Sequence, residues 1–106
     1  MSLGNTNGAV GYQVIYSAAI LQELKRLRAT LSDTEAIRGF AAALRTIHAR
    51  LRRDPTVFGE PRHRLPNSPV VIRAAAVAPV FVSYGVHEER RIVFVREFKL
   101  LGGREP

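Results

Sequence analysis

The segment 61–64 (PRHR), together with Glu60 before it, carries side chains that could act on a phosphate. Arg62 and Arg64 flank His63. An imidazole or a carboxylate can carry a proton, and a guanidinium can hold a phosphate through paired hydrogen bonds. The segment could therefore contact an RNA or DNA backbone, with His63 or Glu60 acting as a base. The alternative is a solvated loop, because phosphate contacts need an organised geometry that a sequence does not reveal.

Further candidate residues lie in the C-terminal half of the chain. Arg73 is the only charged residue between positions 70 and 86, in an otherwise apolar stretch. It could bind a phosphate or an acidic protein, or it could be a charge that protects an edge strand from aggregation. Phe81 could anchor a partner or be a half-buried strand residue. Arg96 and Lys99 form either part of a binding groove or a solubilising edge.

Composition and charge narrow the classes of function. The net charge is +7 and is spread along the chain, which suggests a polyanionic or an acidic protein partner. With no cysteine and three scattered histidines, we expect neither a metal site nor a cofactor. The absence of cysteine fits a cytoplasmic protein. We expect no membrane span and no signal peptide, since the helical patterns are interrupted by charges and the N-terminus lacks a basic and an apolar region.

The N-terminal half predicts a strand followed by two helices. Residues 12–17 are β-branched and aromatic, and Ser17 can cap a helix whose apolar residues continue to Leu31. Ser32 and Glu35 have the spacing of a capping box, so a second helix should begin there. Its apolar stripe runs to Leu51, and the pair Asp54–Pro55 should end it. The two helices should form an antiparallel hairpin.

The C-terminal half predicts a sheet. Residues 54–69 hold four of the six prolines and read as a loop with a short strand or turn. Strands are expected at 70–78, 80–87 and 91–100, with Val82 and Tyr84 on the core face and Phe81 on the other. The result is a single α+β domain over 11–101 with the order β-α-α-β-β-β. Its helical hairpin should pack on one face of a small antiparallel sheet, with flexible tails at 1–10 and 102–106.

Several short motifs occur in a recognisable order. They are LRRDP at 51–55, FGEP at 58–61, Leu65 and VSYGV at 82–86. With the elements described above, this order resembles the RelE/ParE superfamily of toxins from type II toxin–antitoxin systems, which includes plasmid-stabilisation proteins. The resemblance covers nearly the whole chain after about residue 11. It implies a microbial-RNase-like fold and an antitoxin partner. It also implies a target that is either mRNA on the translating ribosome or DNA gyrase.

The resemblance also indicates which catalytic residues are present. RNA-cleaving members commonly have an arginine where this chain has Phe81, and they end in a tyrosine, whereas no tyrosine follows Tyr84 here. Arg73 matches a basic position on the preceding strand, and Lys99 and Arg104 lie near the end of the chain. Without the arginine, a bidentate phosphate clamp is missing, which argues against RelE-type cleavage.

Three functions therefore stay open from the sequence. The first is a toxin-family protein that binds an acidic antitoxin through the basic and aromatic residues Arg62, Arg64, Arg73, Phe81, Arg96 and Lys99. The second is an mRNA endonuclease with a rearranged site in which His63, Glu60 or Lys99 takes part in catalysis. The third is a non-catalytic binding module that keeps the fold. The sequence does not decide whether the protein forms a homo-oligomer.

Overall fold

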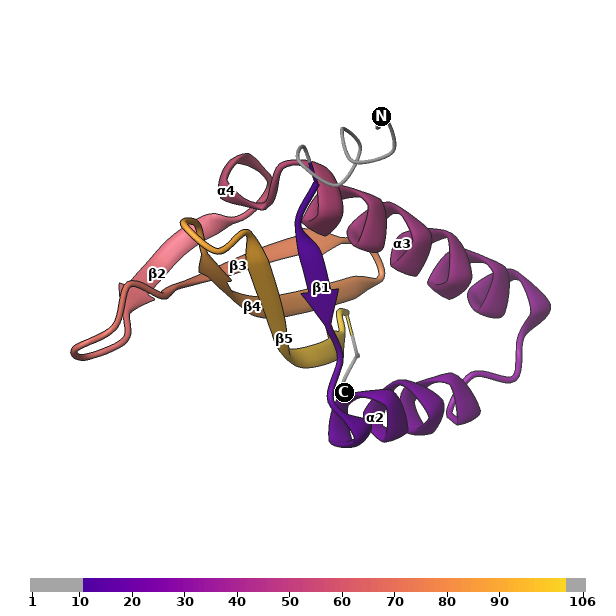
Figure 1. Ribbon diagram of the computed structural model, residues 1–106. Coiled ribbons are helices and arrows are strands. Elements are labelled where there is room, and N and C mark those ends of the chain that lie inside the picture. Colours follow the sequence, from indigo (N-terminus) through magenta and orange to yellow (C-terminus); the bar gives the residue numbers. More distant parts are fainter. Residues whose placement is uncertain (1–10, 103–106) are drawn as a thin grey trace, which may run out of the picture.

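The computed structural model describes residues 11–102, which form an α+β fold (Figure 1). Of the expected tails, 1–10 and 102–106, all residues except Gly102 lie outside the described residues. In chain order the elements are β1 (Gln13–Ile15), α2 (Ala18–Ala29), α3 (Thr34–Arg53), α4 (Pro55–Phe58), β2 (Glu60–Arg64), β3 (Val71–Val77), β4 (Val80–His87) and β5 (Ile92–Leu100).

The five strands form one mixed sheet in the order β1-β5-β4-β3-β2. The pairs β2–β3, β3–β4 and β4–β5 are antiparallel. The pair β1–β5 is parallel, with Gln13 opposite Ile92. The expectation of a purely antiparallel sheet is therefore wrong. After β1 the chain forms the helices and then β2, β3 and β4 before it reaches β5. A connection of this length allows β1 and β5 to be parallel neighbours.

Each of the two long helices begins at a side-chain cap. At α2 the Ser17 hydroxyl accepts a hydrogen bond from the Ile20 amide at 3.1 Å, as predicted. At α3 the cap is Asp33, whose carboxylate accepts from the Ala36 amide at 3.2 Å. The predicted capping box beginning at Ser32 is therefore wrong by one residue. A carboxylate in this position also interacts favourably with the positive end of the helix dipole.

Both long helices pack on the same side of the sheet, called here the helix side. Helix α2 lies against β5, while α3 lies against β1, β3 and β4. Figure 1 shows the two helices diverging from the short link that joins them. The predicted pair of helices on one face is therefore present, but the two axes spread apart instead of packing along their length.

The core lies between α3 and the central strands. Val82 and Tyr84 of β4 and Leu51 of α3 have no exposed surface. This burial confirms the predicted alternation along β4, in which Phe81 and Ser83 face the opposite side, called here the open face. On β5 the alternation changes phase between Val95 and Phe98, both buried, because a bulge interrupts the pairing with β4.

Helix α4 forms a corner that joins α3 to the sheet. The buried Tyr84 hydroxyl donates a hydrogen bond to the Pro55 carbonyl at 2.7 Å, and the Phe58 ring stacks on the Tyr84 ring with centroids 6.2 Å apart. A Cβ at Gly59 would lie 2.5 Å from that hydroxyl and 2.8 Å from the Ala74 carbonyl oxygen. Only glycine allows the chain to pass this closely from α4 into β2.

Replacing Tyr84 with phenylalanine should lower the free energy of unfolding by about 1–2 kcal/mol, because the buried Pro55 carbonyl loses its donor. Urea denaturation measures the change. Tyr16→Phe is the matched control, since the hydroxyl of Tyr16 makes its hydrogen bond at an exposed position and should matter less. Equal stability of Tyr84→Phe and the wild type would contradict a role for this hydrogen bond.

The junction of α3 and α4 should make stability depend on pH. Arg50 donates to both carboxylate oxygens of Asp54, at 2.8 and 3.3 Å, and this pairing lowers the pKa of Asp54. A lowered pKa stabilises the fold above the ordinary carboxyl pKa of about 4 and ceases to do so as the pH falls through the folded-state value. Thermal melts should show Asp54→Asn less stable than the wild type at neutral pH. The two melting curves should converge in acid, and a constant difference would contradict the ion pair.

Candidate functional site

The start of β2 borders a hollow at the edge of the sheet. Glu60 pairs with Ala74, and the next residues of β3, Ala75 and Ala76, have no partner in β2. A hollow of about 300 Å³ lies here, and we call it the edge hollow. Its lining includes Phe58, Glu60, Arg62, Ala74, Ala76 and Phe81. Three of the predicted site residues, from two strands that are not neighbours in the sheet, are therefore brought together.

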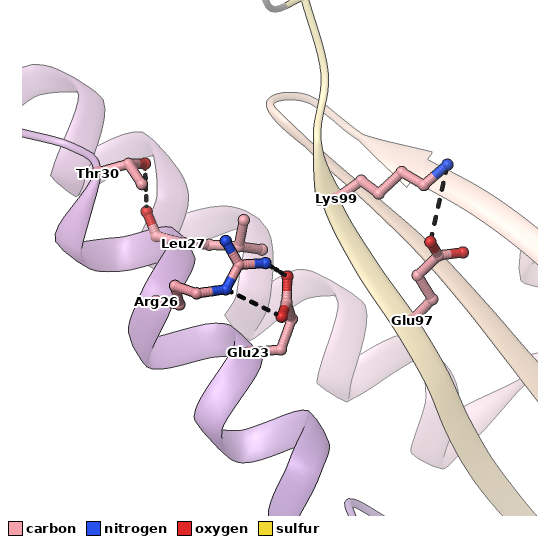
Figure 2. A network of polar contacts seen from close by, with 6 residues as sticks. All are labelled: Glu23, Arg26, Leu27, Thr30, Glu97 and Lys99. Atoms are coloured by element: carbon pink, nitrogen blue, oxygen red, sulfur yellow. Dashed lines mark hydrogen bonds and ion pairs between the residues drawn. The ribbon is translucent and has the colours of Figure 1, made fainter.

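Lys99 joins this group across the open face. It pairs with Phe81 in the register between β4 and β5, and its ammonium nitrogen lies 5.6 Å from the centre of the Phe81 ring. The same nitrogen is 3.7 Å from a carboxylate oxygen of Glu97. Figure 2 shows both side chains pointing away from α2. Because the ion pair is exposed, it holds Lys99 only weakly, and the lysine can exchange Glu97 for an anion from a partner.

The figure also shows the polar contacts of α2 on the other side of β5. There Arg26 pairs with Glu23, one turn away on the same helix, and Thr30 bonds to the Leu27 carbonyl. The carboxylate of Glu23 raises the pKa of Arg26. These contacts stay within α2 and its C-cap Thr30, so they leave the open face and the edge hollow unaffected.

The rest of the PRHR segment points in different directions. A bulge between Pro61 and His63 shifts the register, and His63 then pairs with Ile72, while Arg64 pairs with Val71. Partners in adjacent strands share a face, so His63 lies on the open face and Arg64 on the helix side. Within residues 11–102, no hydrogen bond joins His63 to Glu60 or to either arginine. The bulge therefore separates the residues that the sequence places together.

Arg73 lies on the helix side, opposite Tyr84, and not on the open face with Phe81. Its guanidinium donates to the Gly59 carbonyl at 2.8 and 3.1 Å and to the Thr56 carbonyl at 2.5 Å. Burial raises the pKa of Tyr84, and the nearby Arg73 charge opposes that rise. The side chain thus fastens the α4 corner to β3. This structural use accounts for a charge in an apolar strand.

The remaining candidates lie apart from the edge hollow. Arg96 is exposed at the bulge of β5, outside the lining of the hollow. Arg104 lies outside the described residues. In the described part of the chain, no group of three His, Cys, Asp or Glu side chains could hold a metal ion. No helix there has the length and apolar character to cross a membrane.

The chemistry available at the edge hollow suits binding. Arg62 and Lys99 can pair with carboxylates or phosphates, and Phe81 offers an apolar surface between them. General acid–base catalysis needs a base and an acid within reach of one reacting group. Glu60 is the only acid or imidazole that lines the hollow among the described residues. The hollow therefore provides a charged and aromatic contact surface with one carboxylate.

One polar pair was not predicted from the sequence. The Tyr16 hydroxyl lies 2.6 Å from Nδ1 of His48, and the rings stack with centroids 5.7 Å apart. Partial burial raises the pKa of Tyr16. The signal in the sequence was weak: His48 falls on the apolar stripe of α3, but the contact with β1 depends on how the helix crosses the sheet.

Arg73→Ala should lower the free energy of unfolding by about 2 kcal/mol, because the carbonyls of Gly59 and Thr56 lose a charged donor. Denaturant unfolding of this variant can be compared with Arg62→Ala, an exposed arginine that should change stability by less than about 0.5 kcal/mol. If Arg73→Ala is as stable as Arg62→Ala, the guanidinium does not fasten the corner.

Comparison of the chain with protein-family models, with curated proteins and with solved structures gives no match.

Proposed function

We propose that this chain is a RelE/ParE-like toxin-family protein that binds an acidic antitoxin in the cytoplasm. The observation that carries the proposal is the grouping of Arg62, Phe81 and Lys99 around the edge hollow and the adjacent open face. An aromatic anchor between cations suits a partner segment that alternates apolar and acidic side chains. The net charge of +7 would speed the association with such a partner.

The contacts and the identities of the candidate residues favour binding over RelE-type cleavage. Arg73, the cation that matched a basic position in the resemblance, has its guanidinium bonded to main-chain carbonyls. Phe81 occupies the position where a phosphate-binding arginine would be expected. Lys99 would then be the main cation of the open face, and one lysine is a weak clamp for a transferring phosphoryl group.

One observation supports a second candidate function, that of an mRNA endonuclease with a rearranged site. Glu60 and Arg62 line the same hollow, so a carboxylate base and a phosphate-binding guanidinium would lie side by side. The cellular target, whether mRNA on the ribosome or DNA gyrase, is left to the experiment.

We expect a neighbouring gene to encode an acidic protein. Induced expression of this chain in a bacterial host should arrest growth, and co-expression of that acidic protein should relieve the arrest. Phe81→Ala and Arg62→Ala should weaken capture of that acidic protein by about tenfold or more, because they remove the anchor and a cation. Arg90→Ala, which alters an exposed arginine in the turn before β5, is the matched control and should behave as the wild type. Growth is followed by optical density and capture by a pull-down with purified protein.

The cellular readouts distinguish the candidates. Transcripts cut within codons, and left intact by Glu60→Gln, would favour the endonuclease. Altered plasmid topology with intact transcripts would indicate gyrase. Normal growth together with no binding of the acidic protein would contradict the proposal.

A further inference from the structure

Three arginines form a line along the solvent side of α3. Arg38, Arg45 and Arg52 follow one another at intervals of seven residues, which is about two helical turns. The opposite side of the helix is buried and includes Phe40 and Ile47, whereas all three arginines are exposed. We call these three residues the arginine stripe. It extends over most of the length of α3.

The charges of the arginine stripe are not neutralised within the described part of the chain. None of its three guanidinium groups forms an ion pair or a hydrogen bond there. Arginines elsewhere on the same helices are paired, because Arg26 of α2 bonds to Glu23 and Arg50 of α3 bonds to Asp54. The unpaired cations of α3 are therefore gathered on the side that faces solvent.

The residues around the stripe keep its charges unpaired. An acid four residues after an arginine would pair with it along a helix, but Ala42 and Ala49 occupy these positions after Arg38 and Arg45. Among the positions three or four residues from the stripe, only Glu35 is acidic. The helix dipole does not favour Arg38 either, since it lies toward the positive end of α3. Helix stability therefore does not account for the stripe.

The spacing and the kind of cation suit a duplex of DNA. Seven residues of helix rise about 10 Å, and the major groove of B-form DNA is about 12 Å wide, so neighbouring arginines can reach phosphates on opposite walls of the groove. The planar guanidinium donates paired hydrogen bonds to a phosphate. The small side chains of Ala42 and Ala49 between the arginines allow the helix to approach closely. In A-form RNA the major groove is narrow and does not match this spacing.

We propose that the arginine stripe binds the phosphate backbone of duplex DNA without reading the base sequence. Phosphate contacts position a protein on a duplex and carry no sequence information directly. The stripe consists only of cations that suit phosphates, and the alanines between them offer nothing that distinguishes one base from another. The inference goes beyond the proposed function, which assigns the acidic protein to the edge hollow and the open face.

The first test is a titration of the protein against a labelled DNA duplex of about 20 base pairs, followed by fluorescence anisotropy at several salt concentrations. Each phosphate that is neutralised changes the slope of log K against log salt by about −0.9, so three contacts predict a slope of about −2.7 or steeper. Two duplexes of unrelated sequence should bind equally well. No measurable binding at about 50 mM salt, or a tenfold preference for one sequence, would overturn the proposal.

A triple variant locates the DNA contact on α3. With Arg38→Ala, Arg45→Ala and Arg52→Ala combined, binding at low salt should weaken by about tenfold or more, and the slope should become shallower by about 2.7. The variant should fold normally, because the three side chains are exposed and alanine is a stronger helix former than arginine. Circular dichroism checks the fold. Wild-type affinity and slope in this variant would refute the stripe.

A second triple variant controls for net charge. Lys25→Ala, Arg26→Ala and Arg90→Ala remove three exposed cations outside the stripe, so both triple variants carry the same net charge. The control should bind DNA within about twofold of the wild type and with the same slope. If both variants lose affinity equally, the total charge attracts the DNA and the stripe has no special part, which would overturn the proposal.

Two further measurements exclude other partners for the stripe. An unlabelled RNA duplex of the same sequence should displace the labelled DNA less well than unlabelled DNA does, and better displacement by RNA would contradict the choice of DNA. The stripe variant should still capture the acidic protein. If it loses that protein and keeps its affinity for DNA, the stripe is a protein contact and the DNA proposal fails while the proposed function stands.

Discussion

The arrangement of the chain around the sheet depends on one cross-strand pair, Arg73 and Tyr84. These side chains are opposite each other on the helix side and together bond to the carbonyls of Pro55, Thr56 and Gly59. They thereby hold α4 and the start of β2 against β3 and β4. The register of β2 follows from this corner, and so does the position of Glu60 and Arg62 at the edge of the sheet. A cross-strand pair of polar side chains, of which Tyr84 is fully buried, thus helps to determine where an exposed surface forms.

The two surfaces of the molecule differ in how they are built. The edge hollow and the open face combine the rings of Phe58 and Phe81 with a few charged side chains, beside the small alanine side chains of β3. The hollows between α2 and α3, lined by Leu21, Leu24 and Leu44, are apolar with cations at their rims. A partner that used both would wrap around β5, which separates them. Extended wrapping by an initially disordered chain is a common way to cover such separated surfaces.

Much of the architecture follows from local patterns in the sequence. The alternation along residues 80–87 gives the strand and its buried face, and Ser17 marks the start of α2, because both depend on residues close together in the chain. The side of the sheet on which Arg73 lies depends instead on its register with Tyr84, and the pairing of β1 with β5 depends on the whole fold. The edge hollow could be predicted only in part, since the bulge at Arg62 moves His63 away from its neighbours. The hollows between α2 and α3 depend on the angle between the two helices, which an amphipathic pattern does not specify.

The pairing of β1 with β5 has a consequence for synthesis of the protein. The first described strand has no partner other than the last one, and α2 also packs on that last strand. During translation, the apolar residues of β1 and α2 that contact β5 therefore stay uncovered until β5 has left the ribosome. Such long-range pairing is slow to form, since a large loop must close first. A partner or chaperone that met the nascent chain would encounter the leucines of α2 before the sheet could cover any of them.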